Sequence, residues 1–229
     1  MSSDDIYLVV CSFLTSFSFL DEIDRILTPG YVPSEEDIIR TQPKTSGIRT
    51  TQIKWANIFI NMIDISMQRT IPKKWMHSFE DVTAIAFFVD LAGYDRKLLK
   101  DQAQTELMDS LTRFDEIVNS QWVMRTRIVL FLSNIRLFQA KLAKSPLYRR
   151  FPDYSGANNV ACATKYILRR FEQVNRAQLK IHPHFIQNSD QSSAEEVDTA
   201  IFQVVIENAL SLALSRKYPS IVGTSFLSK

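Results

Sequence analysis

Residues 64–85 decide the fold, and they read Asp64-Ile65-Ser66-Met67-Gln68-Arg69-Thr70-Ile71-Pro72-Lys73-Lys74-Trp75-Met76-His77-Ser78-Phe79-Glu80-Asp81-Val82-Thr83-Ala84-Ile85. An apolar, β-branched run from Ile58 leads directly into Asp64. Such a run is typical of a buried strand that ends at a polar residue. The runs Ala84 to Leu91 and Ile128 to Leu132 predict two more buried strands.

Longer amphipathic segments lie between and after these strands. They predict helices over Lys97 to Asn119, Ala161 to Ala177 and Ser193 to Ala213. Strands that alternate with helices indicate an α/β fold with a mainly parallel sheet covered on both faces. In such a sheet, ligands bind at the carboxyl ends of the strands.

The stretch from Asp64 to Ile85 resembles the second switch of heterotrimeric G-protein α subunits, whose pattern is D-V-G-G-Q-R-x-x-R-K-K-W-x-H-x-F-E-x-V-T-A-I. Residues Asp37 to Ile48 resemble the family's first switch, D-V-L-R-x-R-V-x-T-x-G-I, and the interval between the two fits without a gap. The resemblance runs from about Phe19 to about Leu210. The chain is therefore identified as a divergent, amino-terminally truncated, fungal-type member of that family.

The resemblance implies a Ras-like GTPase domain with a mainly parallel sheet flanked by helices. It also implies that the strand and helix beside the phosphate loop are lacking and that a remnant of the family's α-helical domain is present. The expected organisation is a remnant with an unmatched apolar segment over 1–36, the Ras-like domain over 37–214 and a divergent tail over 215–229.

The apolar stretch Ile6 to Leu20 has two interpretations. At about 15 residues it is shorter than the roughly 20 that a membrane span needs, and its flank carries Asp4 and Asp5 and no basic residue. A buried strand or helix is the other interpretation, and Tyr7 to Val10 could replace the missing central strand.

By resemblance, guanine nucleotide (GTP or GDP) and magnesium are the expected ligands. Gln68 matches the catalytic glutamine, and Thr45 and Asp64 match the magnesium site. The positions that match the nucleotide site are Arg40, Thr41, Lys44, Thr45, Asp64, Ser66, Gln68, Ser133, Asn134, Arg136 and Asn188.

Several of these positions depart from the family pattern. The sequence contains no G-x-x-x-x-G-K-[ST] loop, Met67 stands at the switch glycine, and Gln42 replaces the catalytic arginine, which is worth roughly 10³–10⁵ in rate. Arg136 replaces the aspartate that accepts two hydrogen bonds from guanine. Lost bonds of this strength predict an affinity lower by at least ~10⁴-fold.

The second switch also resembles the family's docking surface for the βγ dimer and for effectors. Its candidate partner-binding residues are Lys73, Lys74, Trp75, His77 and Phe79. An exposed Trp between basic residues is typical of an interface anchor. The alternative is that Trp75 and Phe79, four residues apart, form a buried helix stripe.

Composition and charge narrow the class of function. A net charge of +2 gives no basic field for nucleic acid, and two distant cysteines fit a reducing, cytoplasmic compartment. Partners would bring the protein to the inner face of the plasma membrane.

The first hypothesis is a signalling pseudo-GTPase that binds βγ or effectors. The alternatives are an active GTP-hydrolysing α subunit in receptor-coupled signalling, and a truncated gene product whose first residues are not native.

Overall fold

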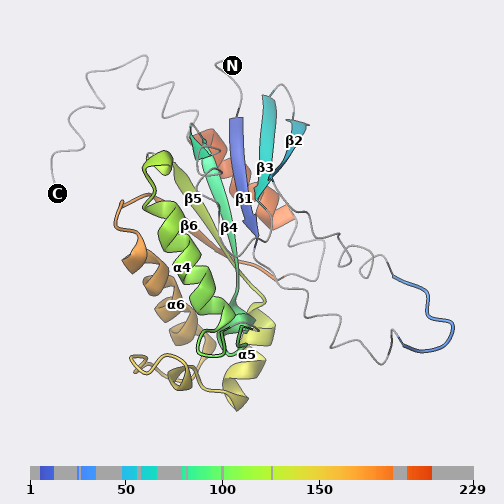
Figure 1. Ribbon diagram of the computed structural model, residues 1–229, viewed down its shortest axis with the longest axis vertical. Helices are drawn as coiled ribbons and strands as arrows, with labels where there is room; N and C mark the ends of the chain where they lie inside the picture. The colour runs from blue at the N-terminus through green and yellow to red at the C-terminus, as the bar shows by residue number, and fades with distance from the viewer. Residues whose placement is uncertain are drawn as a thin grey trace.

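The fold is centred on one six-stranded sheet (Figure 1). The structure is a computed structural model that describes residues 6–12, 25, 27–34, 48–55, 58–65, 79–80, 82–98, 101–124, 126–187 and 195–207. Its strands are β1 (Ile6–Ser12), β2 (Ile48–Trp55), β3 (Ile58–Ile65), β4 (Ala84–Asp90), β5 (Arg127–Ser133) and β6 (Ile181–Phe185). Their spatial order is β2-β3-β1-β4-β5-β6, and each neighbouring pair is parallel except β2 with β3. The predicted α/β class is confirmed.

The centre of the sheet is filled by β1. This strand pairs with β3 through Ile6↔Ile60 and with β4 through Leu8↔Ala84, in both cases in parallel. Tyr7 to Val10 therefore fill the centre of the sheet, as one of the two interpretations of the apolar stretch predicted. That the family's own phosphate-loop strand and helix are lacking stays a prediction. The apolar run can take this place because a central parallel strand is covered on both faces and needs apolar residues on both.

Helices cover both faces of the sheet. The first face packs against α4 (Glu106–Val118), α5 (Ile135–Lys144) and α6 (Val160–Val174), with Phe87 of β4 edge-on to Phe114 of α4 at 5.1 Å between ring centres. The second face packs against the helix over residues 195–207, which lies behind the sheet in Figure 1. Among the described residues, no helix has the length and apolar content to cross a bilayer.

The segment before α4 differs from the prediction of a helix from Lys97. Lys97 instead forms a bridge with Thr105, and the helix begins at Glu106. The Thr105 side chain accepts a hydrogen bond from the Met108 N–H and so caps the helix. This local capping overrides the helical propensity of the preceding residues.

Two histidines on β6 make stability depend on pH. Burial lowers the pKa of both His182 and His184 below the ordinary value of 6.5, and the cation of Lys180 lowers that of His182 further. Below pH 6.5 the unfolded chain therefore binds protons that the folded chain does not, and the free energy of unfolding should fall as the pH falls. Urea unfolding at pH 7.5 and pH 5.5 measures this loss.

The matched variant for this prediction is His182→Gln with His184→Gln. It should lose less stability than the native chain over the same pH interval. An equal loss in both proteins would show that other groups cause the dependence.

Candidate functional site

The carboxyl ends of β4 and β5 bring a set of polar residues together. Asp90, the last residue of β4, pairs in register with Ser133, the last residue of β5. Asn134 follows at once and precedes α5. This is the edge where parallel sheets bind ligands, and it carries three of the residues that the resemblance assigns to the base, Ser133, Asn134 and Arg136.

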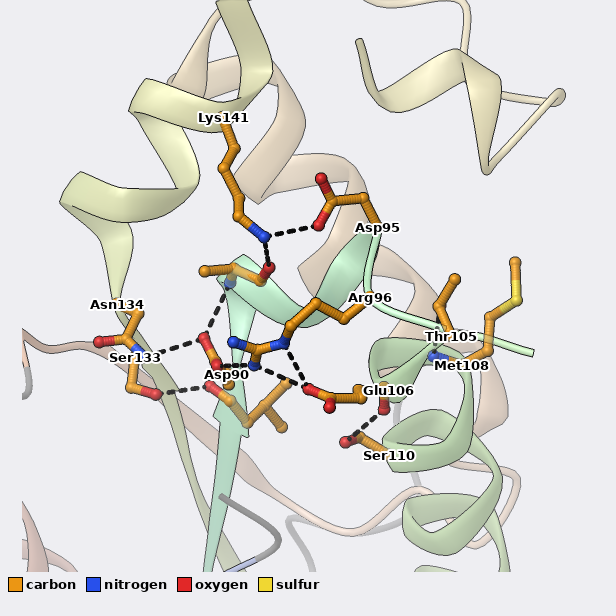
Figure 2. A network of polar contacts seen from close by, with 12 residues as sticks. Asp90, Asp95, Arg96, Thr105, Glu106, Met108, Ser110, Ser133, Asn134 and Lys141 are labelled. Carbon is orange, nitrogen blue, oxygen red and sulfur yellow. Dashed lines mark hydrogen bonds and ion pairs between the residues drawn. The ribbon is translucent and has the colours of Figure 1, made fainter. Parts of the chain in front are cut away.

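Asp90 is the centre of the resulting network (Figure 2). Its carboxylate accepts hydrogen bonds from the Ala92 N–H at 2.9 Å and from the Asn134 amide at 2.9 Å. It also forms an ion pair with Arg96. One carboxylate thereby joins the end of β4, the 3₁₀ helix η2 (Leu91–Tyr94) and the start of α5.

Arg96 connects this network to α4. Its Nε lies 2.8 Å from Glu106 Oε2, in the first turn of the helix. Burial alone would lower the pKa of Arg96, but the carboxylates of Asp90 and Glu106 raise it above the ordinary value. The guanidinium therefore remains charged. A Cβ on Gly93 would lie 2.9 Å from Glu106 Oε2, so a larger residue there would displace this carboxylate.

The side chains of Ser133 and Asn134 both donate hydrogen bonds to other residues of the protein. The Ser133 hydroxyl donates to the Val89 carbonyl oxygen at 2.9 Å, and the Asn134 amide donates to Asp90. Asn134 has a φ of 60°, the left-handed conformation that Asn tolerates better than most residues. Its side chain makes no capping bond to α5. Both side chains are occupied by internal hydrogen bonds.

Arg136 and Gln187 bridge the first turn of α5 and the end of β6. The Arg136 backbone N–H donates to Gln187 Oε1 at 3.1 Å, while the Arg136 side chain is exposed. Nearby, the Lys141 ammonium contacts Asp95 at 2.7 Å and the Ala92 carbonyl oxygen at 2.9 Å. These contacts connect α5 both to the residues after β4 and to the residues after β6.

The described residues do not fit a guanine base. Recognition of the guanine edge needs a carboxylate that accepts two hydrogen bonds, and Arg136 offers only donors at that position. The Asp90 carboxylate at the same edge of the sheet is already paired with Arg96 and Asn134. The arrangement is chemically suited to holding strand ends and helix starts together.

Asp64 is the one predicted magnesium ligand in the described part of the chain. It is the penultimate residue of β3 and pairs in register with Arg49 of β2. Burial raises its pKa, although the Arg49 cation acts in the opposite direction. Burial, together with the charge of Asp64, raises the pKa of the Cys11 thiol in β1. No group of three His, Cys, Asp or Glu residues that could hold a metal occurs among the described residues.

Phe79 lies in the core and not on the surface. Its side chain is 0% exposed and belongs to the cluster between the sheet and α4 to α6. For this residue the structure supports the alternative interpretation, a packing role. The other predicted site residues lie outside the described ranges: Arg40, Thr41, Gln42, Lys44, Thr45, Ser66, Met67, Gln68, Lys73, Lys74, Trp75, His77 and Asn188.

Sequence reasoning missed the residues that organise this edge, Asp90, Arg96, Glu106 and Gln187. The available signal was an acidic residue directly after the apolar run Ala84 to Val89. Its partners could not be inferred, because Arg96 and Asn134 are 6 and 44 positions away.

Comparison with known proteins identifies one and the same family by sequence profile and by individual relatives. The sequence profile of the family described as "G-protein alpha subunit" matches residues 12–205. The guanine nucleotide-binding protein alpha-3 subunit of Neurospora crassa is 46% identical over 192 residues, which are 84% of this chain and 54% of that protein. The alpha-2 subunit of Saccharomyces cerevisiae is 44% identical over 193 residues, 84% of this chain and 43% of that protein. The chain spans about half the length of these relatives.

Proposed function

The chain belongs to the G-protein α-subunit family, and we propose that within it the chain is a signalling subunit without a guanine-nucleotide cycle. The observation that carries this proposal is the network of hydrogen bonds and ion pairs around Asp90 at the carboxyl ends of β4 and β5. Ser133 donates its hydrogen bond to Val89, and the Asn134 amide donates to Asp90. Arg136 places a cation at the position where the family has the carboxylate that binds the base.

The substitutions outside the described residues support the same proposal. By resemblance, Met67 places a side chain where the family needs a glycine N–H close to the γ-phosphate. Gln42 supplies no cation to the developing charge of the transition state. Both changes weaken phosphate chemistry, independently of the change at the base.

The partners in this proposal are a βγ dimer or an effector. The candidate contact is the second switch, where Lys73, Lys74, Trp75 and His77 match the family pattern. An aromatic residue beside two cations is the kind of anchor that dominates protein interfaces. A cytoplasmic protein with such a contact would reach the inner membrane face through its partners.

An active GTPase is the second candidate. The relatives carry "guanine nucleotide-binding" in their names. Thr45, Asp64 and Gln68 keep the residue types of the magnesium and water-positioning sites.

The test is calorimetric titration of the folded chain with a non-hydrolysable GTP analogue in the presence of magnesium. We expect no saturable binding below about 100 µM, because the lost bonds to base and phosphate lower the affinity by at least ~10⁴-fold. The Neurospora crassa relative, titrated in parallel, is the positive control. Micromolar or tighter binding by this chain would overturn the proposal, and a turnover assay with GTP would then test the active alternative.

A second arm of the same experiment adds a purified fungal βγ dimer without nucleotide. Binding that weakens in Lys73→Glu with Lys74→Glu would support the proposed contact. Absence of binding to βγ, combined with absence of nucleotide binding, would leave effectors as the partner class.

A further inference from the structure

The chain carries a strong local excess of positive charge between residues 136 and 180. This segment contains ten Lys and Arg residues against two Asp and Glu residues, a net charge of +8, whereas the whole chain carries +2. The rest of the chain is therefore net acidic. The cations lie on α5, on the turn that follows it and on α6.

Four of the ten cations are neutralised locally. Lys141, Arg170, Arg176 and Lys180 form ion pairs with Asp95, Asp153, Asp115 and Glu207. The other six form no ion pair with any residue that the structure describes. They are Arg136, Lys144, Arg149, Arg150, Lys165 and Arg169.

Five of these six form what we call the basic face: Lys144, Arg149, Arg150, Lys165 and Arg169. Lys144 ends α5, Arg149 and Arg150 lie at the 3₁₀ helix η4 (Leu147–Arg149), and the remaining two are one turn apart on α6. Four of them are exposed, and the Nε atom of Arg150 is buried without a hydrogen-bond partner. The contact between the ring of Phe151, next to Arg150, and the ring of Tyr166, next to Lys165, brings this turn beside the middle of α6.

Packing holds these three elements in one arrangement. The Asn158 amide donates to the Leu142 carbonyl oxygen at 3.1 Å and so ties the turn to α5. The rings of Phe151 and Tyr154 lie 5.8 and 5.0 Å from the ring of Tyr166 on α6. The backbone positions that carry the cations are therefore fixed before any partner arrives, which lowers the entropic cost of binding.

We propose that the basic face binds an acidic segment of a partner protein. Three of its five cations are arginines, whose planar guanidinium groups pair with carboxylates through two parallel hydrogen bonds. Clustered unpaired cations also attract an acidic partner over long range and raise its association rate. All five cations lie between residues 144 and 169, outside residues 64–85, which resemble the second switch.

Other anionic partners fit this face less well. Single-stranded nucleic acid needs several exposed aromatic rings on which its bases stack, and Tyr148, 54% exposed, is the one such large aromatic side chain among described residues 136–180. Membrane surfaces are bound through exposed Trp, Phe and Leu beside the cations, and Leu137 is the one such side chain in the same range.

The experiment measures fluorescence anisotropy of a fluorescein-labelled 20-residue peptide made of five Glu-Glu-Ser-Gly repeats, at 50 mM and 300 mM NaCl. We expect Lys165→Gln with Arg169→Gln to weaken binding roughly 10-fold, from a loss of about 2- to 5-fold for each exposed charge pair. Adding Lys144→Gln and Arg149→Gln should bring the loss to the order of 100-fold. The higher salt concentration should weaken native binding by screening.

The matched control is Arg176→Gln with Lys180→Gln. It removes the same two charges from the chain but takes them from cations that already have carboxylate partners. We expect less than a 2-fold change. An equal loss in the control and test variants would overturn the proposal, because net charge alone would then explain binding. Tighter binding to phosphatidylserine vesicles or to a 20-mer of thymidine would overturn the choice of partner.

Discussion

Replacing Leu8 by Ala should lower the free energy of unfolding by about 2–5 kcal/mol. Leu8 lies in the middle of β1 and is 1% exposed. It belongs to the cluster that packs under the helix over residues 195–207, together with Ile60 and Val204. Removal of its side chain would leave a cavity between β3, β4 and that helix, and close-packed neighbours fill such a cavity only in part.

Urea unfolding followed by circular dichroism measures this loss, with Leu137→Ala as the matched control. Leu137 is a leucine on α5 with 43% of its surface exposed, so its truncation should cost less than about 1 kcal/mol. Equal midpoints for the native chain and Leu8→Ala would mean that residues 6–12 do not form the centre of the sheet.

Asp90→Ala should cost about 3–5 kcal/mol, because it removes one partner of a largely buried ion pair. The Asp90 side chain is 12% exposed, and it holds Arg96, the Ala92 N–H and the Asn134 amide at the same time. Arg96 would keep its ion pair with Glu106 but would lose the one with Asp90. The start of α5 would also lose its tie to β4.

The control for Asp90→Ala is Asp153→Ala. Asp153 also pairs with an arginine, Arg170, but its side chain is 60% exposed, and such pairs contribute about 0–1 kcal/mol. Asp90→Asn, which keeps the shape and one acceptor, should fall between the two. Similar losses for Asp90→Ala and Asp153→Ala would show that the network at the edge of the sheet contributes little to stability.

The sheet could be predicted well from the sequence because its strands are apolar runs with clear ends. The runs ending at Asp64, Leu91 and Leu132 correspond to β3, β4 and β5 within one residue. The interpretation of Tyr7 to Val10 as a core strand also came from its apolar character. Pro183 in the middle of β6 is a sign of an edge strand, since proline donates no ladder hydrogen bond, and it could have been used.

The site was less predictable, because it depends on contacts between distant residues. Arg136 and Ser133 could be placed by resemblance, but the direction of the Ser133 and Asn134 side chains follows from Asp90 and Val89, 44 residues earlier. The start of α4 is set locally by the Thr105 cap, but the tie from this helix to the end of β4 depends on Arg96, which holds Glu106 across a ten-residue interval. Local patterns do not contain such information.

The central position of β1 also determines when the sheet can assemble during synthesis. Ile6–Ser12 leave the ribosome before both of their neighbours, because Ile58–Ile65 and Ala84–Asp90 follow about 50 and about 80 residues later. Throughout that interval an apolar strand presents two unpaired edges to other chains. Because non-local strand pairing is slow, nascent chains are more exposed to aggregation than the completed fold, and chaperone binding to Ile6–Ser12 during synthesis would protect them.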